Sequence, residues 1–192
     1  MTEETLYYPE ETNTYKAGDA IELGTWWNKP EVKAPLRWIV LDQDEQGILL
    51  VSENLIDTKP FHDKLVNAKW KRCSLRKWLN GEFYKEAFSR EERKRILEIH
   101  QEAFQTKDHV ILVTKDLFER YPKVFSVPSV PTAYAKSKGD PEEEPKTGYW
   151  WWVLGRNGSD AMAMPQSDPD TLYFYISTGQ YYVRPVIRLR NE

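Results

Sequence analysis

The chain has 192 residues, and its 27 Lys and Arg against 30 Asp and Glu give a formal net charge of −3. This mild acidity argues against a general nucleic-acid binder, and no apolar run reaches the ~18 residues that a membrane-spanning helix needs. Eight Trp, 11 Tyr and seven Phe are spread along the chain, which argues against disorder and predicts a folded domain.

The first 17 residues are polar with scattered Tyr, so we expect an N-terminal arm over residues 1–17 and a single domain over residues 18–192. The first five residues include acidic side chains and no apolar core, which is unlike a signal peptide. Cys73 is the only cysteine, so no intramolecular disulfide can form. These features favour a cytoplasmic protein.

The N-terminal part of the domain predicts strands. Residues 19–23 alternate between polar and apolar, which predicts a strand that Gly24 ends, and the prolines in residues 28–35 predict a loop. Residues 36–41 and 47–52 are almost entirely apolar and are joined by a short polar link. They predict a β-hairpin that is buried on both faces or nearly so.

The middle of the chain predicts helices. Ser74 can cap a helix with Leu75, Trp78 and Leu79 on one face, and Asn80-Gly81 should interrupt it because glycine tolerates left-handed geometry. A capping box from Ser89 to Glu92 predicts a second helix that ends near His100. A strand at residues 109–113, a short helix that begins after Thr114 and ends at Pro122, and a helical turn at residues 132–136 follow.

The C-terminal part again predicts strands, after an acidic loop insertion at residues 139–148. Strands are expected at residues 149–154, 171–176 and 182–189. The last places Val183, Ile187 and Leu189 on one face and three arginines on the other, which is typical of a half-buried strand; these are Arg184, Arg188 and Arg190. Pro185 cannot donate to a ladder, so we expect an edge strand or a bulge there.

We find few residues that could carry catalysis. Cys73 precedes a helix start beside Lys71 and Arg72, which would lower a thiol pKa, but nothing in the sequence orients His62 toward it. The acidic residues at 142–144 and 168–170 either ligate a hard cation or are solvated loop carboxylates. We predict no catalytic residue, no metal site and no cofactor.

Basic residues are concentrated between Lys69 and Arg95, where the sequence has ten basic residues and four acidic ones. This run forms either solvated helix faces or a patch for an acidic partner.

The unusual feature is the run Tyr149-Trp150-Trp151-Trp152. In a strand Trp150 and Trp152 share one face and Trp151 takes the other, so the rings either pack in the core or leave one face for a ligand. A Gly/Asn loop follows, and two tyrosines precede the last strand. We therefore expect a ligand-binding surface made of Trp150, Trp152, Arg156, Asn157, Tyr181 and Tyr182.

Four stretches together resemble a bacterial family of proteins of unknown function, the domain-of-unknown-function family six-two-seven-three. They are Leu36-Arg37-Trp38-Ile39-Val40-Leu41 with Gly47-Ile48-Leu49-Leu50-Val51-Ser52, Trp70-Lys71-Arg72-Cys73-Ser74-Leu75-Arg76-Lys77-Trp78-Leu79-Asn80 with Phe83 and Ala87-Phe88-Ser89, Tyr149-Trp150-Trp151-Trp152-Val153-Leu154-Gly155 and Tyr182-Val183-Arg184-Pro185-Val186-Ile187. The resemblance extends from about residue 18 to residue 190. The family has no established activity, so the resemblance implies a fold more than a function.

The last block also resembles C-type-lectin-like folds, including the formylglycine-generating and sulfatase-modifying group. This resemblance implies an α+β fold with mixed antiparallel sheets, two or three short helices and paired N- and C-terminal strands. Ligands would meet the loops between residues 154 and 180. The cysteine pair of the formylglycine-generating enzymes is missing here, and Lys146 stands where a calcium-dependent lectin needs an oxygen ligand.

Taken together, the sequence favours a non-catalytic module that binds a glycan, a peptide or a protein through the aromatic surface, with no nucleic acid and no membrane involved. One alternative is an enzyme of formylglycine-generating-like fold that uses other residues. The other is a structural module in which the Trp face is an oligomer interface.

Overall fold

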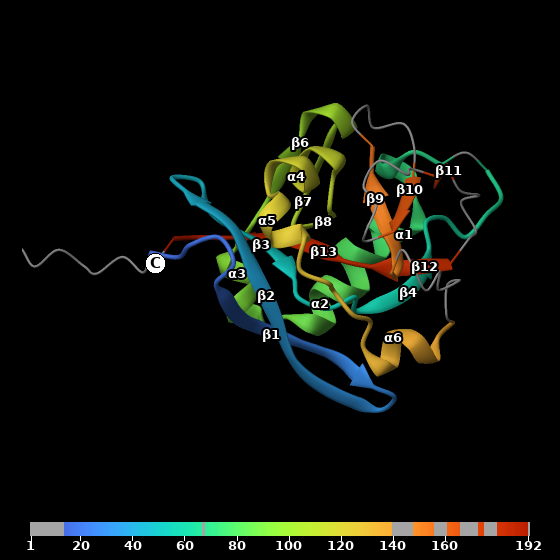
Figure 1. The fold of residues 1–192 in the computed structure, drawn as a ribbon, viewed down its shortest axis with the longest axis horizontal. Coiled ribbons are helices and arrows are strands. Elements are labelled where there is room, and N and C mark those ends of the chain that lie inside the picture. The colour runs from blue at the N-terminus through green and yellow to red at the C-terminus, as the bar shows by residue number, and fades with distance from the viewer. Residues whose placement is uncertain are drawn as a thin grey trace, which may run out of the picture.

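A computed structural model describes residues 14–66, 68–139, 148–155, 161–165, 173–174 and 180–191 (Figure 1). The backbone alone is described for residues 161–165 and 173–174. Most of the expected arm at residues 1–17 and of the expected acidic insertion at residues 139–148 lies outside these ranges. In the described part of the arm, the Tyr15 amide donates to Gln43 Oε1 at 2.6 Å.

The described residues form an α+β fold, as the sequence predicts, with short helices and mostly antiparallel sheets. The strands are β1 (Ala20–Lys29), β2 (Val32–Asp44), β3 (Gly47–Ser52), β4 (Asp57–Pro60), β5 (Ile96–Leu97), β6 (Ile99–Gln101), β7 (Thr106–Asp108), β8 (Val110–Leu112), β9 (Trp150–Leu154), β10 (Ala161–Pro165), β11 (Tyr173–Phe174), β12 (Gln180–Val183) and β13 (Pro185–Leu189). The helices are α1 (Ser74–Trp78), α2 (Tyr84–Ala87), α3 (Arg90–Arg95), α4 (Lys115–Arg120), α5 (Pro122–Phe125) and α6 (Ala133–Ser137), with 3-10 turns η1 (Trp70–Arg72) and η3 (Glu102–Phe104) and a π-helical turn η2 (Leu79–Phe83).

Two sheets make up most of the fold. The first has the order β1-β2-β3-β13-β5, and β8 also pairs with β13. The second has the order β11-β10-β9-β12-β4, in which β9 and β12 are parallel. A separate hairpin joins β6 and β7. Figure 1 shows the long β1–β2 hairpin running across the molecule, with β9, β10 and β12 on its right side.

The chain passes from one sheet to the other at two neighbouring places. β3 leads to β4 through residues 53–56, and β12 leads to β13 through Arg184 alone. The Ile56 amide donates to the Val183 carbonyl at 2.9 Å, and Arg184 Nε donates to the Ser52 carbonyl at 3.1 Å. These bonds fasten the two passages together, so Arg184 stands at the corner where both sheets meet.

Two hydrophobic clusters fill the faces of the sheets. One contains Trp38, Leu79, Phe83 and Ile187 and is covered by the helical segment from α1 to α2. The other contains Val51, Phe118, Phe125 and Val186 and is covered by α4 and α5. Because protein covers both faces, β3 is buried along its whole length, as expected for the predicted hairpin.

Several local predictions are confirmed and others are wrong. The β2–β3 hairpin, the capping box of Ser89 and Glu92 and the Thr114 cap are present. The helices are short, as expected, and the described residues contain six α-helices where the resemblance implied two or three. The first and last strands do not pair, because β2 and β3 lie between β1 and β13. No helix in the described part of the chain is long and apolar enough to cross a bilayer.

Several boundaries differ from the prediction for physical reasons. β1 continues past Gly24 with a shift in register, and it pairs with β2 through most of residues 28–35, where a loop was predicted. The Asn80-Gly81 pair does not end the helix but forms the π turn η2, because Asn80 bonds to the neighbouring β8. α3 ends at Arg95 and the chain continues as β5, which pairs with β13. Pro185 opens β13, a strand with partners on both sides rather than an edge; a first residue needs no ladder N–H.

Candidate functional site

The aromatic residues of β9 occupy the core. Trp150 and Trp152 lie in the first hydrophobic cluster and Trp151 in the second, which confirms that they alternate across the strand. Trp152 and Trp151 are fully buried and Trp150 is 7% exposed. Trp152 Nε1 donates to the Lys59 carbonyl at 2.8 Å, so its polar edge is satisfied by protein.

The two tyrosines of the expected ligand surface lie on opposite faces of β12. Tyr181 is partly exposed and meets Trp152 edge-to-face at 4.9 Å, and it lies 6.5 Å from Trp150. Tyr182 is fully buried on the other face. Arg156 and Asn157 lie outside the described residues. The structure therefore brings Trp150, Trp152 and Tyr181 together as packing partners, and their role in ligand binding stays a prediction.

Cys73 is a structural residue. Its side chain is fully buried and accepts a hydrogen bond from the Arg76 amide at 3.3 Å, so it caps α1 in place of the expected Ser74. Burial raises the pKa of the Cys73 thiol to about 12, which is opposite to the lowering that its basic neighbours suggested. His62 Nδ1 bonds to Ser74 at 2.9 Å rather than to Cys73.

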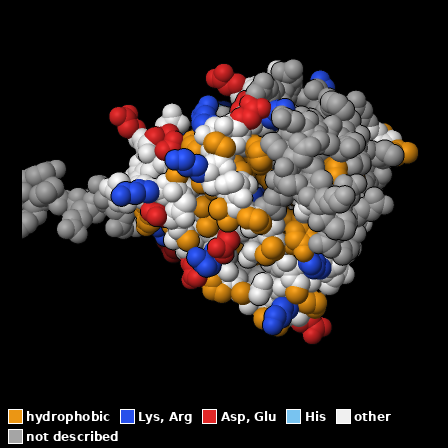
Figure 2. All heavy atoms as spheres, in the orientation of Figure 1, with side chains coloured by type: hydrophobic (Ala, Val, Ile, Leu, Met, Phe, Trp, Pro, Cys, Tyr) orange, Lys and Arg blue, Asp and Glu red, His pale blue; other side chains and the backbone are white. Residues whose placement is uncertain are grey.

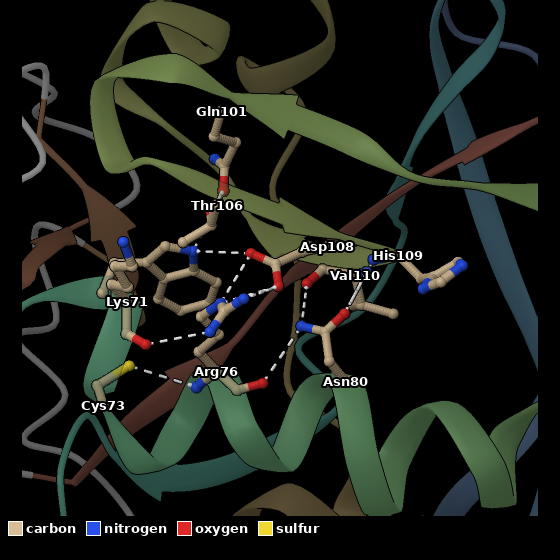
Figure 3. A network of polar contacts seen from close by, with 10 residues as sticks. Lys71, Cys73, Arg76, Asn80, Gln101, Thr106, Asp108, His109 and Val110 are labelled. Atoms are coloured by element: carbon tan, nitrogen blue, oxygen red, sulfur yellow. Dashed lines mark hydrogen bonds and ion pairs between the residues drawn. The ribbon is translucent and has the colours of Figure 1, made fainter.

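The stretch from Cys73 to Asn80 anchors α1 to the β6–β8 segment through a buried polar network (Figure 3). Arg76 forms a bidentate pair with Asp108, with nitrogen–oxygen distances of 2.7 to 2.9 Å. The Asp108 side chain is 1% exposed. Trp70 Nε1 lies between Asp108 and Gln101 and donates to both, at 3.3 and 3.1 Å.

Asn80 extends this network to the start of β8. Its Oδ1 accepts from the His109 and Val110 amides at 2.9 and 3.0 Å, and its Nδ2 donates to the Val110 carbonyl at 2.8 Å. Figure 3 shows these contacts rising from one face of the helix toward the strands. The side chain pairs with the strand as a neighbouring strand would, which satisfies three backbone groups. The network therefore has a structural role, because it holds the segment from α1 to η2 against residues 108–110.

Metal-ligating side chains do not cluster in the described part of the chain. The described residues contain no group of three or more His, Cys, Asp or Glu side chains that could hold a metal ion. The buried carboxylates are Asp108, which pairs with Arg76, and Asp57, which pairs with Lys138 at 3.2 Å. Burial raises the pKa of Asp57, while Lys59 and Lys138 oppose that rise.

Part of the basic run borders a surface hollow of about 610 Å³, whose lining includes Lys69, Lys71, Arg72, His62 and Gln105. Lys69, Lys71 and Arg72 are exposed, so water already solvates their charges. Exposed cations gain little from an ion pair. This geometry fits the solvated-surface interpretation of the run.

A second hollow, of about 370 Å³, opens between the start of β1 and α5. We call it the Arg184 pocket, because Arg184 lines it from the corner between the two sheets. Its other polar lining residues are Arg37, Glu53 and Lys123, and its apolar side chains are Ala17, Ala20, Ile39, Val124, Val127 and Pro128. Figure 2 shows hydrophobic side chains gathered over α5 and the segment that follows it.

Arg184 is a buried cation. The residue is 2% exposed, and its guanidinium carbon lies 5.2 Å from the Phe125 ring and 5.3 Å from the Trp151 ring. Its Nη1 is buried and has no hydrogen-bond partner among the described residues. Burial lowers the pKa of Arg184 to about 10, so the group keeps its charge at neutral pH.

The sequence prediction missed Arg184, because it placed this residue on the polar face of a half-buried strand. Arg184 instead lies in the link between β12 and β13, where the Phe125 and Trp151 rings cover its guanidinium. One signal was available: Arg184 lies between the apolar pairs Tyr182-Val183 and Val186-Ile187, and a charge inside such a run is unusual in a core.

A comparison of the chain with models of known protein families gives a match over residues 45–116. No curated protein and no solved structure matches the chain, so the resemblance to C-type-lectin-like folds is not confirmed. The match begins in the β2–β3 turn and ends in α4, and it includes the whole Arg76–Asp108 network. The match is to the family model of DUF6273, a domain of unknown function; it confirms the family resemblance for residues 45–116, and the resembling stretches at residues 36–41, 149–155 and 182–187 lie outside it.

Proposed function

We propose that this chain is a non-catalytic ligand-binding module and that the Arg184 pocket is its site. One observation carries the proposal: a hollow of about 370 Å³ has a buried, charged side chain in its wall. Pockets for small ligands typically occupy about 300–1,000 Å³ and combine an apolar lining with a few polar groups. The Arg184 pocket has both properties.

The position of the pocket in the fold supports the proposal. Its walls come from β1, β2, α5 and the corner between the sheets, which are far apart in sequence but joined by the packed core. The aromatic strand β9 also takes part, because Trp151 supports the guanidinium from behind. The aromatic run then serves the site as a rigid backing.

The larger hollow beside Lys69 is a weaker candidate. Its cations are exposed to solvent, whereas Arg184 is buried and therefore largely desolvated. A ligand that contacts an already desolvated cation gains more binding free energy than a ligand that must first displace water from an exposed cation. This difference, rather than volume, favours the Arg184 pocket.

The test compares two exposed valines. Val127 lines the pocket and is 64% exposed, while Val130 is 52% exposed and does not line it. We expect Val127→Trp to abolish binding of small apolar probes, measured by ligand-observed NMR with a fragment library, and Val130→Trp to leave it unchanged. If no fragment binds in a manner that Val127→Trp removes, the proposed function is wrong.

A further inference from the structure

We infer that the ligand of the Arg184 pocket is an organic carboxylate, an acidic group carried on an apolar body. The inference rests on the proposed function and adds the chemical class of the ligand. It follows from the charge of Arg184, the charges at the pocket rim and the shape of the apolar lining.

The charge of Arg184 has no anionic partner in the described part of the chain. Nε donates to the Ser52 carbonyl, a neutral group, and Nη1 has no partner. The acidic residue that lines the pocket is Glu53, and it pairs with Arg37 at 3.6 Å rather than with Arg184. Phe125 and Trp151 hold the guanidinium, but an aromatic ring offsets only a small part of a buried charge.

A carboxylate would supply the anionic partner that Arg184 lacks among the described residues. A buried cation without a counter-ion carries a large desolvation cost, and a bound anion offsets that cost. Nε is already bonded to the Ser52 carbonyl, and the N–H groups of the two terminal nitrogens form a planar fork that matches the two oxygens of a carboxylate. The rim adds Arg37 and Lys123 against Glu53, so the lining favours anions over cations.

The lining also requires an apolar body. Ala20, Ile39, Val124 and Val127 cover much of the wall. A water molecule occupies about 30 Å³, so an inorganic anion a few waters in size would leave most of the hollow unfilled. An aliphatic or aromatic body attached to the carboxylate would fill it.

The experiment uses a panel of carboxylates with linear, alicyclic and aromatic bodies, each paired with its primary amide of nearly equal shape. Affinities are measured by calorimetry. We expect at least one carboxylate to bind the protein about tenfold or more tightly than its amide, because charge-assisted hydrogen bonds are the stronger class. In Arg184→Gln, which keeps a donor for the Ser52 carbonyl, this preference should vanish.

Arg184→Lys keeps the charge but loses the planar fork, so it should retain only part of the preference. It also serves as the second variant if Arg184→Gln fails to fold. The Val127→Trp and Val130→Trp pair separates the two proposals. If amides and carboxylates bind equally and Val127→Trp abolishes both, the pocket is a site but the anionic class is wrong. If neither binds in a way that Val127→Trp removes, the proposed function itself is wrong.

Discussion

The Arg76–Asp108 pair should be a main stabilising contact within the stretch that matches DUF6273. Asp108 is 1% exposed and Arg76 is 25% exposed, both as side chains. Removing one partner of a buried ion pair costs about 3–5 kcal/mol, because the remaining charge is left without compensation. Arg76 can regain some water, so we place Asp108→Ala at the low end, about 3 kcal/mol of the free energy of unfolding.

The loss of the Trp70 hydrogen bond in Asp108→Ala should cost less than the loss of the ion pair. Trp70 Nε1 loses the acceptor at 3.3 Å but keeps Gln101 Oε1 at 3.1 Å. The double variant Arg76→Met with Asp108→Leu replaces both charges with apolar groups. It should lose less stability than the single variants Arg76→Met and Asp108→Leu summed, with a coupling of about 2 kcal/mol.

The assay is urea denaturation followed by far-ultraviolet circular dichroism. The matched control is Lys94→Ala, which breaks the exposed pair of Lys94 with Glu91 and should cost no more than about 1 kcal/mol. The reasoning is refuted if Asp108→Ala costs as little stability as Lys94→Ala. It is also refuted if the losses in the single variants Arg76→Met and Asp108→Leu add up to the loss in the double variant.

Three further predictions concern other positions. Gly47→Ala should destabilise the protein by about 3 kcal/mol or more, because φ is +127° and a Cβ would collide with the β13 backbone, while Gly81→Ala has free space and should be neutral or stabilising in thermal unfolding. Glu92→Ala should cost about 1–2 kcal/mol at pH 7, since this carboxylate accepts two backbone amides. Burial acts to raise the pKa of Glu92, but those hydrogen bonds outweigh it and lower the pKa, so the contribution should be full above about pH 4.5 and be lost on acidification; a pH-independent difference from wild type contradicts this. Cys73 should react with a thiol reagent only as fast as the protein unfolds, and rapid reaction of the native state would show that the thiol is not buried.

Local chemistry in the sequence predicted much of the fold. The capping box at Ser89 and the alternation of Trp150, Trp151 and Trp152 depend on neighbours within a few residues, and both are present. Such features can be read from one stretch of chain because the interacting groups lie on it.

Long-range pairing set the features that the sequence could not show. Asn80 looked like a helix end, but its hydrogen bonds to residues 109 and 110 hold the helix together through η2. β5 is a strand because β13 lies beside it, although its residues continue an apparently helical pattern. In each case the deciding partner is distant in sequence, and its position could not be inferred without the fold.

The same limit applies to the candidate site. Arg184 resembled an exposed strand residue because a single strand shows alternation but not what covers each face. Its burial follows from Phe125 and Trp151, which come from two other elements. The aromatic run was correctly singled out as unusual, but its described rings pack inward.

The most direct test of the account is the side-chain Nε–H resonance of Arg184 in a ¹H–¹⁵N spectrum, assigned with Arg184→Lys. Titration with a carboxylate of the panel should shift this resonance and saturate with the same dissociation constant as calorimetry, while the matched amide leaves it in place. A resonance that does not move while the carboxylate binds elsewhere would contradict the assignment of Arg184 as the group that receives the ligand.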